Sequence, residues 1–221
     1  MNFDWQFAWE IMPELLRGLV VTVKATIIGT LLAAVLGLIW AMARRSKHRT
    51  ICWPVASIVE FIRSTPVLVQ IYFLFYVLPE FGISMTPLLT GIIALGIHYS
   101  GFMSEVYRAG IEGVDRGQWE AATALNLNRR QTWFKVILPQ AIPPIIPALG
   151  NYFVAMFKDT PMLSAITVLE LLQSSKIIGS ETFRYLEPLT MAGIFFLVCS
   201  LLAASFIRWS ERKLHVHGAR P

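Results

Sequence analysis

Two ionisable side chains in an apolar stretch are the first residues of this sequence that could do chemistry. Glu60 and Arg63 lie three residues apart, so on one face of a helix they can neutralise each other. A charge at membrane depth costs at least about 3 kcal/mol on insertion scales, so such residues are also functional candidates. We favour an internal ion pair that fixes its helix, and we keep both residues as candidates for a path through the membrane.

A second polar group lies at the end of a later apolar stretch. Its members can carry charge or form hydrogen bonds, and they are Asn151, Tyr152, Lys158, Asp159 and Thr160. A zwitterion has an ammonium and a carboxylate group, so Asp159 with Asn151, Tyr152 and Thr160 would suit its chemistry. Lys158 and Asp159 lie nearer the outer boundary and could instead contact a soluble partner. Both alternatives stay open, and all five residues are candidates for the substrate path.

Membrane-spanning helices are the elements expected to position these residues. Hydrophobic residues make up 55% and charged residues 15% of the 221 residues, and the mean hydropathy is +0.58, far from the composition of a soluble domain. A spanning helix needs about 20 mainly apolar residues. The stretches of this kind are residues 19–43, 51–78, 87–103, 136–157 and 188–207. We therefore predict one all-α integral membrane domain with five transmembrane helices.

Two of these stretches contain interior prolines, each of which removes a backbone hydrogen bond and pushes on the preceding turn. The second contains Pro54 and Pro66, so we expect it to be bent or broken. The fourth has a proline at every fourth position, namely Pro139, Pro143 and Pro147. This fourth helix either has a fixed kink or acts as a hinge that lines a translocation path.

Two further segments are expected at a membrane surface. The apolar segment Met162–Leu172 is too short to span, so we predict a helix that lies on one surface. Residues 1–14 contain no Lys or Arg, so a cleaved signal is not expected. Their aromatic pattern suits an interfacial anchor and consists of Phe3, Trp5, Phe7 and Trp9.

The distribution of Lys and Arg predicts the orientation, because cytoplasmic flanks carry the excess. Most of the 19 basic residues lie in residues 44–49, 108–135 and 208–220. With five spans, the N-terminus is then outside and the C-terminus inside. The net charge of +5 is explained by this asymmetry, so no nucleic-acid partner is expected.

Enzyme motifs are missing from the sequence: there is no GxxxxGK[ST] loop, no HExxH and no GxSxG. We therefore predict no catalytic residue, no metal site and no cofactor on this chain, and any ATP must bind another chain. Cys52 and Cys199 are interpreted as packing residues. His98 could relay protons, but a lone histidine without a nearby carboxylate favours a helix contact.

A polar island separates the third and fourth apolar stretches and runs from Gly117 to Ala122. We predict a short helix over residues 116–128, which Asp115 caps with Gln118 in a capping box. Small residues at Ala121 and Ala122 would let another surface approach closely. The residues alone leave two alternatives equal: a docking helix, or an amphipathic helix on the lipid headgroups.

The spacing of this island resembles a known motif. Glu120-Ala121-Ala122, then Asn126, then Val136-Ile137-Leu138-Pro139 is similar to the EAA loop of type I ATP-binding-cassette (ABC) importer permeases. Other motifs resemble the branch of polar amino-acid permeases that serves His, Glu, Gln, Arg and opines. They are Arg63–Pro66, Leu68–Gln70, Tyr107–Ile111 and Lys158–Thr160. Two positions depart from the pattern: Asn126 replaces the usual glycine, and Pro161 replaces serine. Asn is the commonest non-glycine residue in the left-handed conformation, so the turn at Asn126 is expected to persist.

The resemblance implies a five-helix permease of a bacterial cytoplasmic (inner) membrane. It implies three partners: a cytoplasmic ATPase that binds ATP and Mg²⁺, a second permease that is the same or a homologous chain, and an extracytoplasmic substrate-binding protein. The coupling helix 116–128 would sit in a groove of the ATPase. The matching coupling residues are Gly117, Glu120, Ala121, Ala122, Asn126, Leu138 and Pro139.

The expected substrate is an amino acid or a close derivative, and a cyclic compatible solute such as ectoine fits the same class. One alternative is an ion-gradient-driven secondary transporter of small zwitterions, although such proteins are usually built from internal repeats. Another is a membrane scaffold subunit, which would not need a helix rich in prolines with polar residues beside it.

Overall fold

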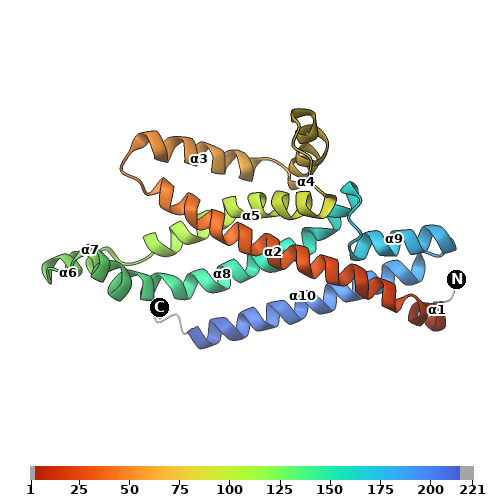
Figure 1. Ribbon diagram of the computed structural model, residues 1–221. Coiled ribbons are helices and arrows are strands. Elements are labelled where there is room, and N and C mark those ends of the chain that lie inside the picture. The colour runs from red at the N-terminus through yellow and green to blue at the C-terminus, as the bar shows by residue number, and fades with distance from the viewer. Residues whose placement is uncertain (1–2, 215–221) are drawn as a thin grey trace.

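The chain folds into an elongated bundle of helices in a computed structural model that describes residues 3–214 (Figure 1). Within that range there is no β-strand, so the prediction of an all-α chain is confirmed. The α-helices are α1 (Trp5–Glu10), α2 (Met12–Arg44), α3 (Arg49–Ser64), α4 (Val67–Tyr72), α5 (Pro87–Glu112), α6 (Arg116–Ala124), α7 (Arg129–Gln131), α8 (Leu138–Asp159), α9 (Leu171–Thr182) and α10 (Leu186–Leu214). Short stretches of π- or 3₁₀-helix extend them at Phe73–Val77, Leu78–Phe81, Thr132–Ile137 and Thr160–Ile166.

Three helices, α2, α5 and α10, are each long and apolar enough to cross a membrane. Two bent pairs are α3 with residues 67–81, bent by 105°, and residues 129–166 with α9, bent by 48°. If each bent pair is one span, the described residues contain five candidate spans. Helices α2, α5, α8 and α10 run along the bundle, whereas α3 splays away from α2 (Figure 1). Helices α6 and α7 lie at one end of the bundle, and α1 and α9 lie at the other.

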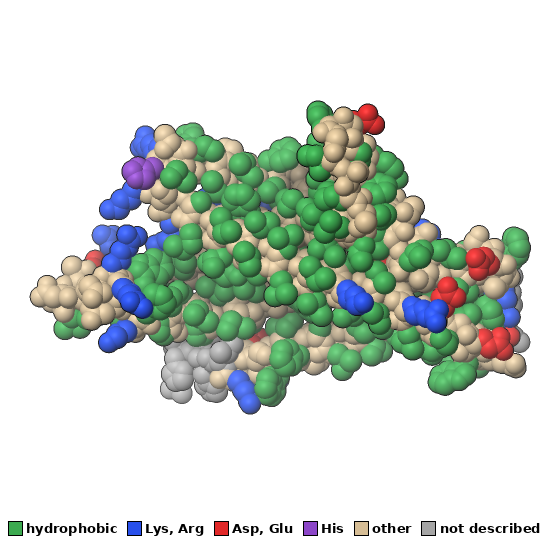
Figure 2. All heavy atoms as spheres, viewed as in Figure 1, with side chains coloured by type: hydrophobic (Ala, Val, Ile, Leu, Met, Phe, Trp, Pro, Cys, Tyr) green, Lys and Arg blue, Asp and Glu red, His purple; other side chains and the backbone are tan. Residues whose placement is uncertain are grey.

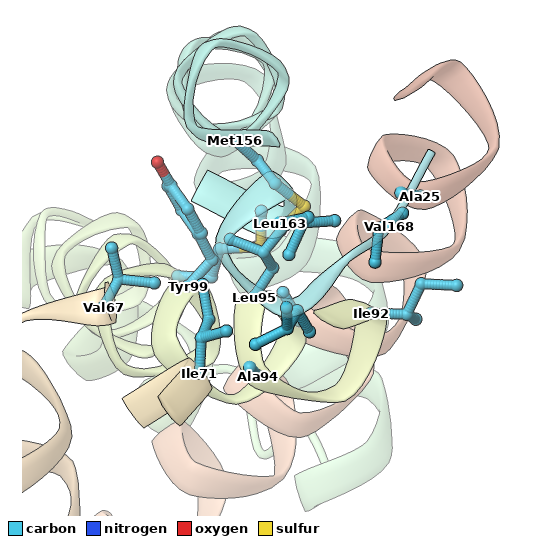
Figure 3. Packing of buried hydrophobic residues seen from close by; sticks show 13 residues of the cluster. Ala25, Val67, Ile71, Ile92, Ala94, Leu95, Tyr99, Met156, Leu163 and Val168 are labelled. Carbon is cyan, nitrogen blue, oxygen red and sulfur yellow. The ribbon is translucent and has the colours of Figure 1, made fainter. Parts of the chain in front are cut away.

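Helices α2 and α5 approach closely because small residues face the contact, as is usual between membrane helices. A Cβ atom on Gly37 would lie 3.0 Å from the carbonyl oxygen of Ser100. The main core lies beside this contact, where Leu95 and Tyr99 of α5 meet Met156 of α8 (Figure 3). This core fixes the position of α8 relative to α5.

Gly37→Ala is expected to destabilise the fold by about 1–3 kcal/mol, since backbone atoms of α5 must shift to admit the new methyl group. Gly193→Ala on α10 is the matched control, because nothing lies within 4 Å of its added Cβ in this chain. Thermal unfolding of the two variants in detergent measures the difference. Equal midpoints for both variants would contradict the close contact of α2 with α5.

The second apolar stretch is broken, as expected, and the break lies at Pro66. Pro54 lies inside α3 without interrupting it. The side chain of Gln70 stabilises the break, because its Nε2 donates to the carbonyl oxygen of Ile62 at 2.8 Å and to Oγ1 of Thr65 at 2.6 Å. The first of these bonds satisfies the Ile62 carbonyl, whose helical partner would be the nitrogen of Pro66, which has no hydrogen to donate.

The prediction of a surface helix over Met162–Leu172 is wrong. The segment begins as a 3₁₀-helix, turns at Thr167 with φ 64°, and continues into α9. Leu163, Ile166 and Leu171 are fully buried. The segment is apolar because it folds back into the bundle, and Figure 3 shows Leu163 among the core side chains of α5 and α8.

Candidate functional site

Helix α6 begins at a capped turn at the basic end of the molecule. Figure 2 shows Lys and Arg side chains gathered around α6 and α7, whereas several Asp and Glu side chains lie at the opposite end. Oδ1 of Asp115 accepts a hydrogen bond from the backbone N–H of Gly117 at 2.7 Å, so the predicted cap is confirmed. The predicted capping box is wrong, because Oε1 of Gln118 accepts from Nε2 of Gln140 at 3.3 Å instead.

One side of α6 packs against the rest of the chain. Ala122 is only 2% exposed, and the ring of Trp119 lies edge-on to that of Trp133, with 5.5 Å between centroids. The guanidinium of Arg45 lies 5.6 Å from the Trp133 ring centroid, which connects α6 to the turn after α2. The sequence motif placed Ala121 and Ala122 together, but the structure separates them, since Ala121 is exposed.

The opposite side of α6 is exposed and has glycine or alanine at three of four positions. With 100° between successive residues, Gly117, Glu120 and Ala124 fall on the side away from Ala122, and Ala121 lies at its edge. All four residues are exposed, and we call them the outward face of α6. Glu120 and Arg116 form an ion pair of 3.2 Å there. Glycine and alanine at the other three positions let the backbone of α6 approach a partner closely.

Asn126 ends this helix in the left-handed conformation, with φ 52°, as predicted for the residue that replaces glycine. The backbone N–H of Leu127 donates to the carbonyl oxygen of Ala122 at 3.0 Å, which closes the turn. Leu138 is half-buried and Pro139 exposed at the start of α8. Proline is tolerated there, since the first turn of a helix needs no backbone donor.

Asn126→Gly is expected to leave folding and transport nearly unchanged, because glycine adopts a positive φ without strain. Asn126→Val is expected to cost about 1–2 kcal/mol, because a β-branched residue is disfavoured in that conformation. Thermal unfolding and ATP-driven uptake of the two variants test this turn. If valine were tolerated as well as glycine, the turn would not depend on its left-handed residue.

The structure places the five candidate path residues at the end of α8 in three different environments. Oδ2 of Asp159 accepts a hydrogen bond of 2.7 Å from the hydroxyl of Tyr99, and the rings of Tyr99 and Tyr152 lie 6.2 Å apart. Asp159 and Tyr152 therefore share one site. Asn151 and Lys158 are exposed outside it. The fifth residue, Thr160, is buried and donates to the carbonyl oxygen of Phe157 at 2.7 Å.

Two further side chains complete this aromatic site. Phe102 lies 5.8 Å from Tyr152 and 5.3 Å from His98, measured between ring centroids. Nδ1 of His98 is 3.3 Å from Oε1 of Gln70, so His98 lies at a contact between α4 and α5. The site thus combines an acidic group, hydroxyl groups and aromatic faces. Aromatic faces attract cations, and the carboxylate can accept bonds from an ammonium group.

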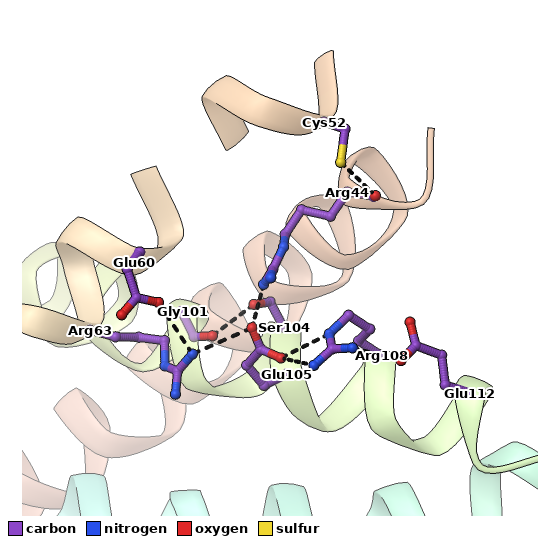
Figure 4. A network of polar contacts seen from close by, with 9 residues as sticks. All are labelled: Arg44, Cys52, Glu60, Arg63, Gly101, Ser104, Glu105, Arg108 and Glu112. Atoms are coloured by element: carbon purple, nitrogen blue, oxygen red, sulfur yellow. Dashed lines mark hydrogen bonds and ion pairs between the residues drawn. The ribbon is translucent and has the colours of Figure 1, made fainter. Parts of the chain in front are cut away.

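The ion pair expected between Glu60 and Arg63 is present, with 3.7 Å between Nη1 and Oε2. Arg63 also contacts Glu105 of α5 at 3.4 Å, and Glu105 binds Arg44 and Arg108 as well (Figure 4). Glu105 is not among the residues predicted from the sequence, because the predicted third stretch ends at residue 103, whereas α5 continues to residue 112.

The family follows from a comparison with known proteins. Residues 33–216 match the family described as "Binding-protein-dependent transport system inner membrane component". The chain belongs to this family. It is therefore a permease subunit of an ABC transporter, and it has the type I ABC permease fold.

Known permeases resemble this one over nearly their whole length. A "Probable amino-acid ABC transporter permease protein y4tG" of Sinorhizobium fredii (strain NBRC 101917 / NGR234) is 50% identical over 217 residues, 98% of this chain and 94% of that protein. The "L-cystine transport system permease protein TcyB" of Bacillus subtilis (strain 168) is 36% identical over 196 residues, 86% of this chain and 82% of that protein. A solved "amino acid ABC transporter with histidines" has a TM-score of 0.91 and 34% identity, and the match covers 96% of this chain and 100% of that one.

The permease is a transport subunit and not an enzyme, because ATP hydrolysis in such transporters occurs on a separate subunit. Its family implies an ATPase and a substrate-binding protein as partners. These relatives give no support to a compatible solute such as ectoine or to a gradient-driven transporter.

Proposed function

We propose that this permease forms the translocation path of an ATP-driven importer for amino acids. The observation that carries the proposal is the outward face of α6, an exposed surface with three small residues at the basic end of the bundle. It has the shape and position for docking on a cytoplasmic ATPase. The amino-acid substrate is supported by the names of the two relatives and of the solved transporter.

The proposed location is a bacterial inner membrane, with the α6 end in the cytoplasm. Arg44, Arg45, Lys47 and Arg49 join α2 to α3 at this end, and Arg129 and Arg130 form α7 beside them. Cytoplasmic flanks carry such an excess of basic residues. The N-terminus is then outside and the C-terminus inside. His215, His217 and Arg220 of the tail lie outside the described residues.

The proposed complex contains two permeases, two ATPases and one substrate-binding protein. ATP and Mg²⁺ bind the ATPases, and this chain binds neither. The second permease is the same chain or a homologue, and either choice gives each ATPase one α6 helix. The binding protein meets the acidic end of the bundle, where Arg184 bonds to Asp4 at 3.2 Å and to Glu187 at 2.7 Å.

Substrate passes beside α8 in this proposal. Asp159 with Tyr99 accepts the ammonium group, and the rings of Tyr152 and Phe102 form an apolar wall. Closure of the ATPases draws the two α6 helices together and opens the path to the outside, and hydrolysis reverses the movement. The prolines of α8, including Pro143 and Pro147, would let this helix bend as access alternates.

Uptake by reconstituted vesicles tests the proposal. The permease is inserted with its co-purified ATPase and binding protein, and radiolabelled L-cystine, L-glutamine, L-arginine and L-histidine are supplied in turn. We expect uptake of at least one amino acid that requires ATP and survives dissipation of ion gradients. Uptake that requires a proton or sodium gradient and does not require ATP would contradict the proposal.

A further inference from the structure

We propose that Arg63 is a carboxylate-binding group on the translocation path and that Glu105 positions it. The inference rests on the proposed function, because it takes the substrate to be an amino acid. Arg63 would form a second substrate-binding site on the path, on the α6 side of the Tyr99–Asp159 pair. Glu105 and Phe102 follow Tyr99 along α5 toward α6, which gives this order.

The Nε edge of the Arg63 guanidinium is not hydrogen-bonded within the described residues. Both carboxylate contacts are made by Nη1, at 3.4 Å to Glu105 and 3.7 Å to Glu60. Nε is buried and has no hydrogen-bond partner in the described part of the chain. An unpaired buried donor costs about 1–3 kcal/mol. The Nε edge of a guanidinium matches a carboxylate with two parallel hydrogen bonds, so a substrate carboxylate would remove this cost.

The positive charge of Arg63 is only partly compensated by its carboxylate partners. Glu105 is shared among three guanidinium groups: Oε1 contacts Arg44 and Arg63, and Oε2 contacts Arg108 at 2.7 Å. Arg63 has the longest of these contacts. Its other partner, Glu60, has a side chain that is 70% exposed, and exposed ion pairs contribute little. Arg63 is therefore the cation of this network with the least compensation, and it can accept another anion.

Arg63 lies beside the aromatic site. The Arg63 guanidinium lies 5.5 Å from the ring centroid of Phe102, which belongs to the same aromatic site as Tyr152 and Tyr99. Gly101 lets the side chain reach this place, because an added Cβ there would lie 3.0 Å from Cγ of Arg63. Figure 4 shows Arg63 crossing α5 beside Gly101, with Glu105 holding its Nη1 atom.

Direct binding to the detergent-purified complex of permease and ATPase, without the binding protein, tests the proposal. The probes are radiolabelled L-arginine, L-glutamine, L-histidine and L-cystine, each displaced by the unlabelled acid or by its carboxamide. We expect the wild type to prefer the acid by about tenfold. Arg63→Gln should bind the acid and the amide equally, and Glu105→Gln should lose most of the preference. Arg63→Lys keeps the positive charge but cannot form two parallel hydrogen bonds with a carboxylate. It should therefore retain only part of the preference for the acid.

Glu112→Gln is the matched control, because Glu112 contacts Arg108 at 2.6 Å and not Arg63, and it should keep the wild-type preference. A folded Arg63→Gln variant that still preferred the acid by tenfold would overturn the inference alone. If Arg63→Gln did not fold, Arg63→Lys with an unchanged preference would overturn it equally. Failure of the wild-type complex to bind any of the four amino acids would contradict the proposed amino-acid substrate, and this inference with it.

Discussion

Ala121→Arg is expected to reduce ATP-driven uptake strongly while the chain stays folded in the membrane. Ala121 is exposed on the outward face of α6, so the new side chain meets solvent in the isolated chain. In the complex it would separate α6 from the ATPase groove. Changes at the centre of an interface often cost about 2 kcal/mol or more, so uptake should fall by roughly 30-fold. ATP hydrolysis by the complex should then no longer respond to substrate.

Ala121→Ser is the matched control and should transport normally, because serine adds one hydroxyl without closing the approach. Ala122→Arg would be a poor test, since Ala122 is buried and the variant would disturb the fold of α6. Uptake by reconstituted vesicles and ATPase activity are measured on the same preparations. Uptake at the wild-type rate by Ala121→Arg would contradict the assignment of α6 as the coupling helix.

Asp159→Asn is expected to reduce uptake by about 10- to 100-fold. A hydrogen bond to a charged group contributes about 1.5–3 kcal/mol, which corresponds to that range. The substitution keeps the size of the side chain, and the amide oxygen can still accept the bond from Tyr99, so folding should be retained. The loss would thus come from the missing negative charge toward the ammonium group of the substrate.

Lys158→Gln is the matched control, because Lys158 is the exposed neighbour of Asp159 on the same helix. It should transport at nearly the wild-type rate. Initial uptake rates at several substrate concentrations, with surface expression measured in parallel, separate transport from folding. Equal losses of uptake in the two variants would mean that the charge of Asp159 does not bind the ammonium group of the substrate.

Local features of the fold could be predicted from the sequence because their causes are local. Pro66 marks the break after α3, and Asp115 caps α6. Asn126 adopts the left-handed conformation expected of an asparagine that replaces glycine. Each depends on the backbone preference of one residue or on a side-chain hydrogen bond to a neighbour in the sequence, so distant contacts are not needed to predict it.

Features that depend on distant contacts could not be predicted. Tyr99 and Asp159 are 60 residues apart and meet only because α5 packs on α8. Glu105 ended the apolar run in the sequence, yet α5 continues past it, because arginines from α2, α3 and α5 compensate its charge.

The segment Met162–Leu172 was misread for a related reason. Apolar composition alone does not distinguish a helix on a membrane surface from a segment buried in the bundle. Leu163, Ile166 and Leu171 are buried against neighbours that lie far away in the sequence. The position of this segment therefore depends on its packing against distant residues and cannot be predicted from its own residues.

The most direct test of the central claim, that α6 couples this permease to a separate ATPase, is what co-purifies with it. The chain is tagged in its native host, extracted in mild detergent and analysed by mass spectrometry, beside the Ala121→Arg variant. We predict a stoichiometric ATP-binding subunit with the wild type and a reduced amount of it with the variant. Recovery of the wild-type chain alone, under conditions that preserve a known importer complex, would contradict the account.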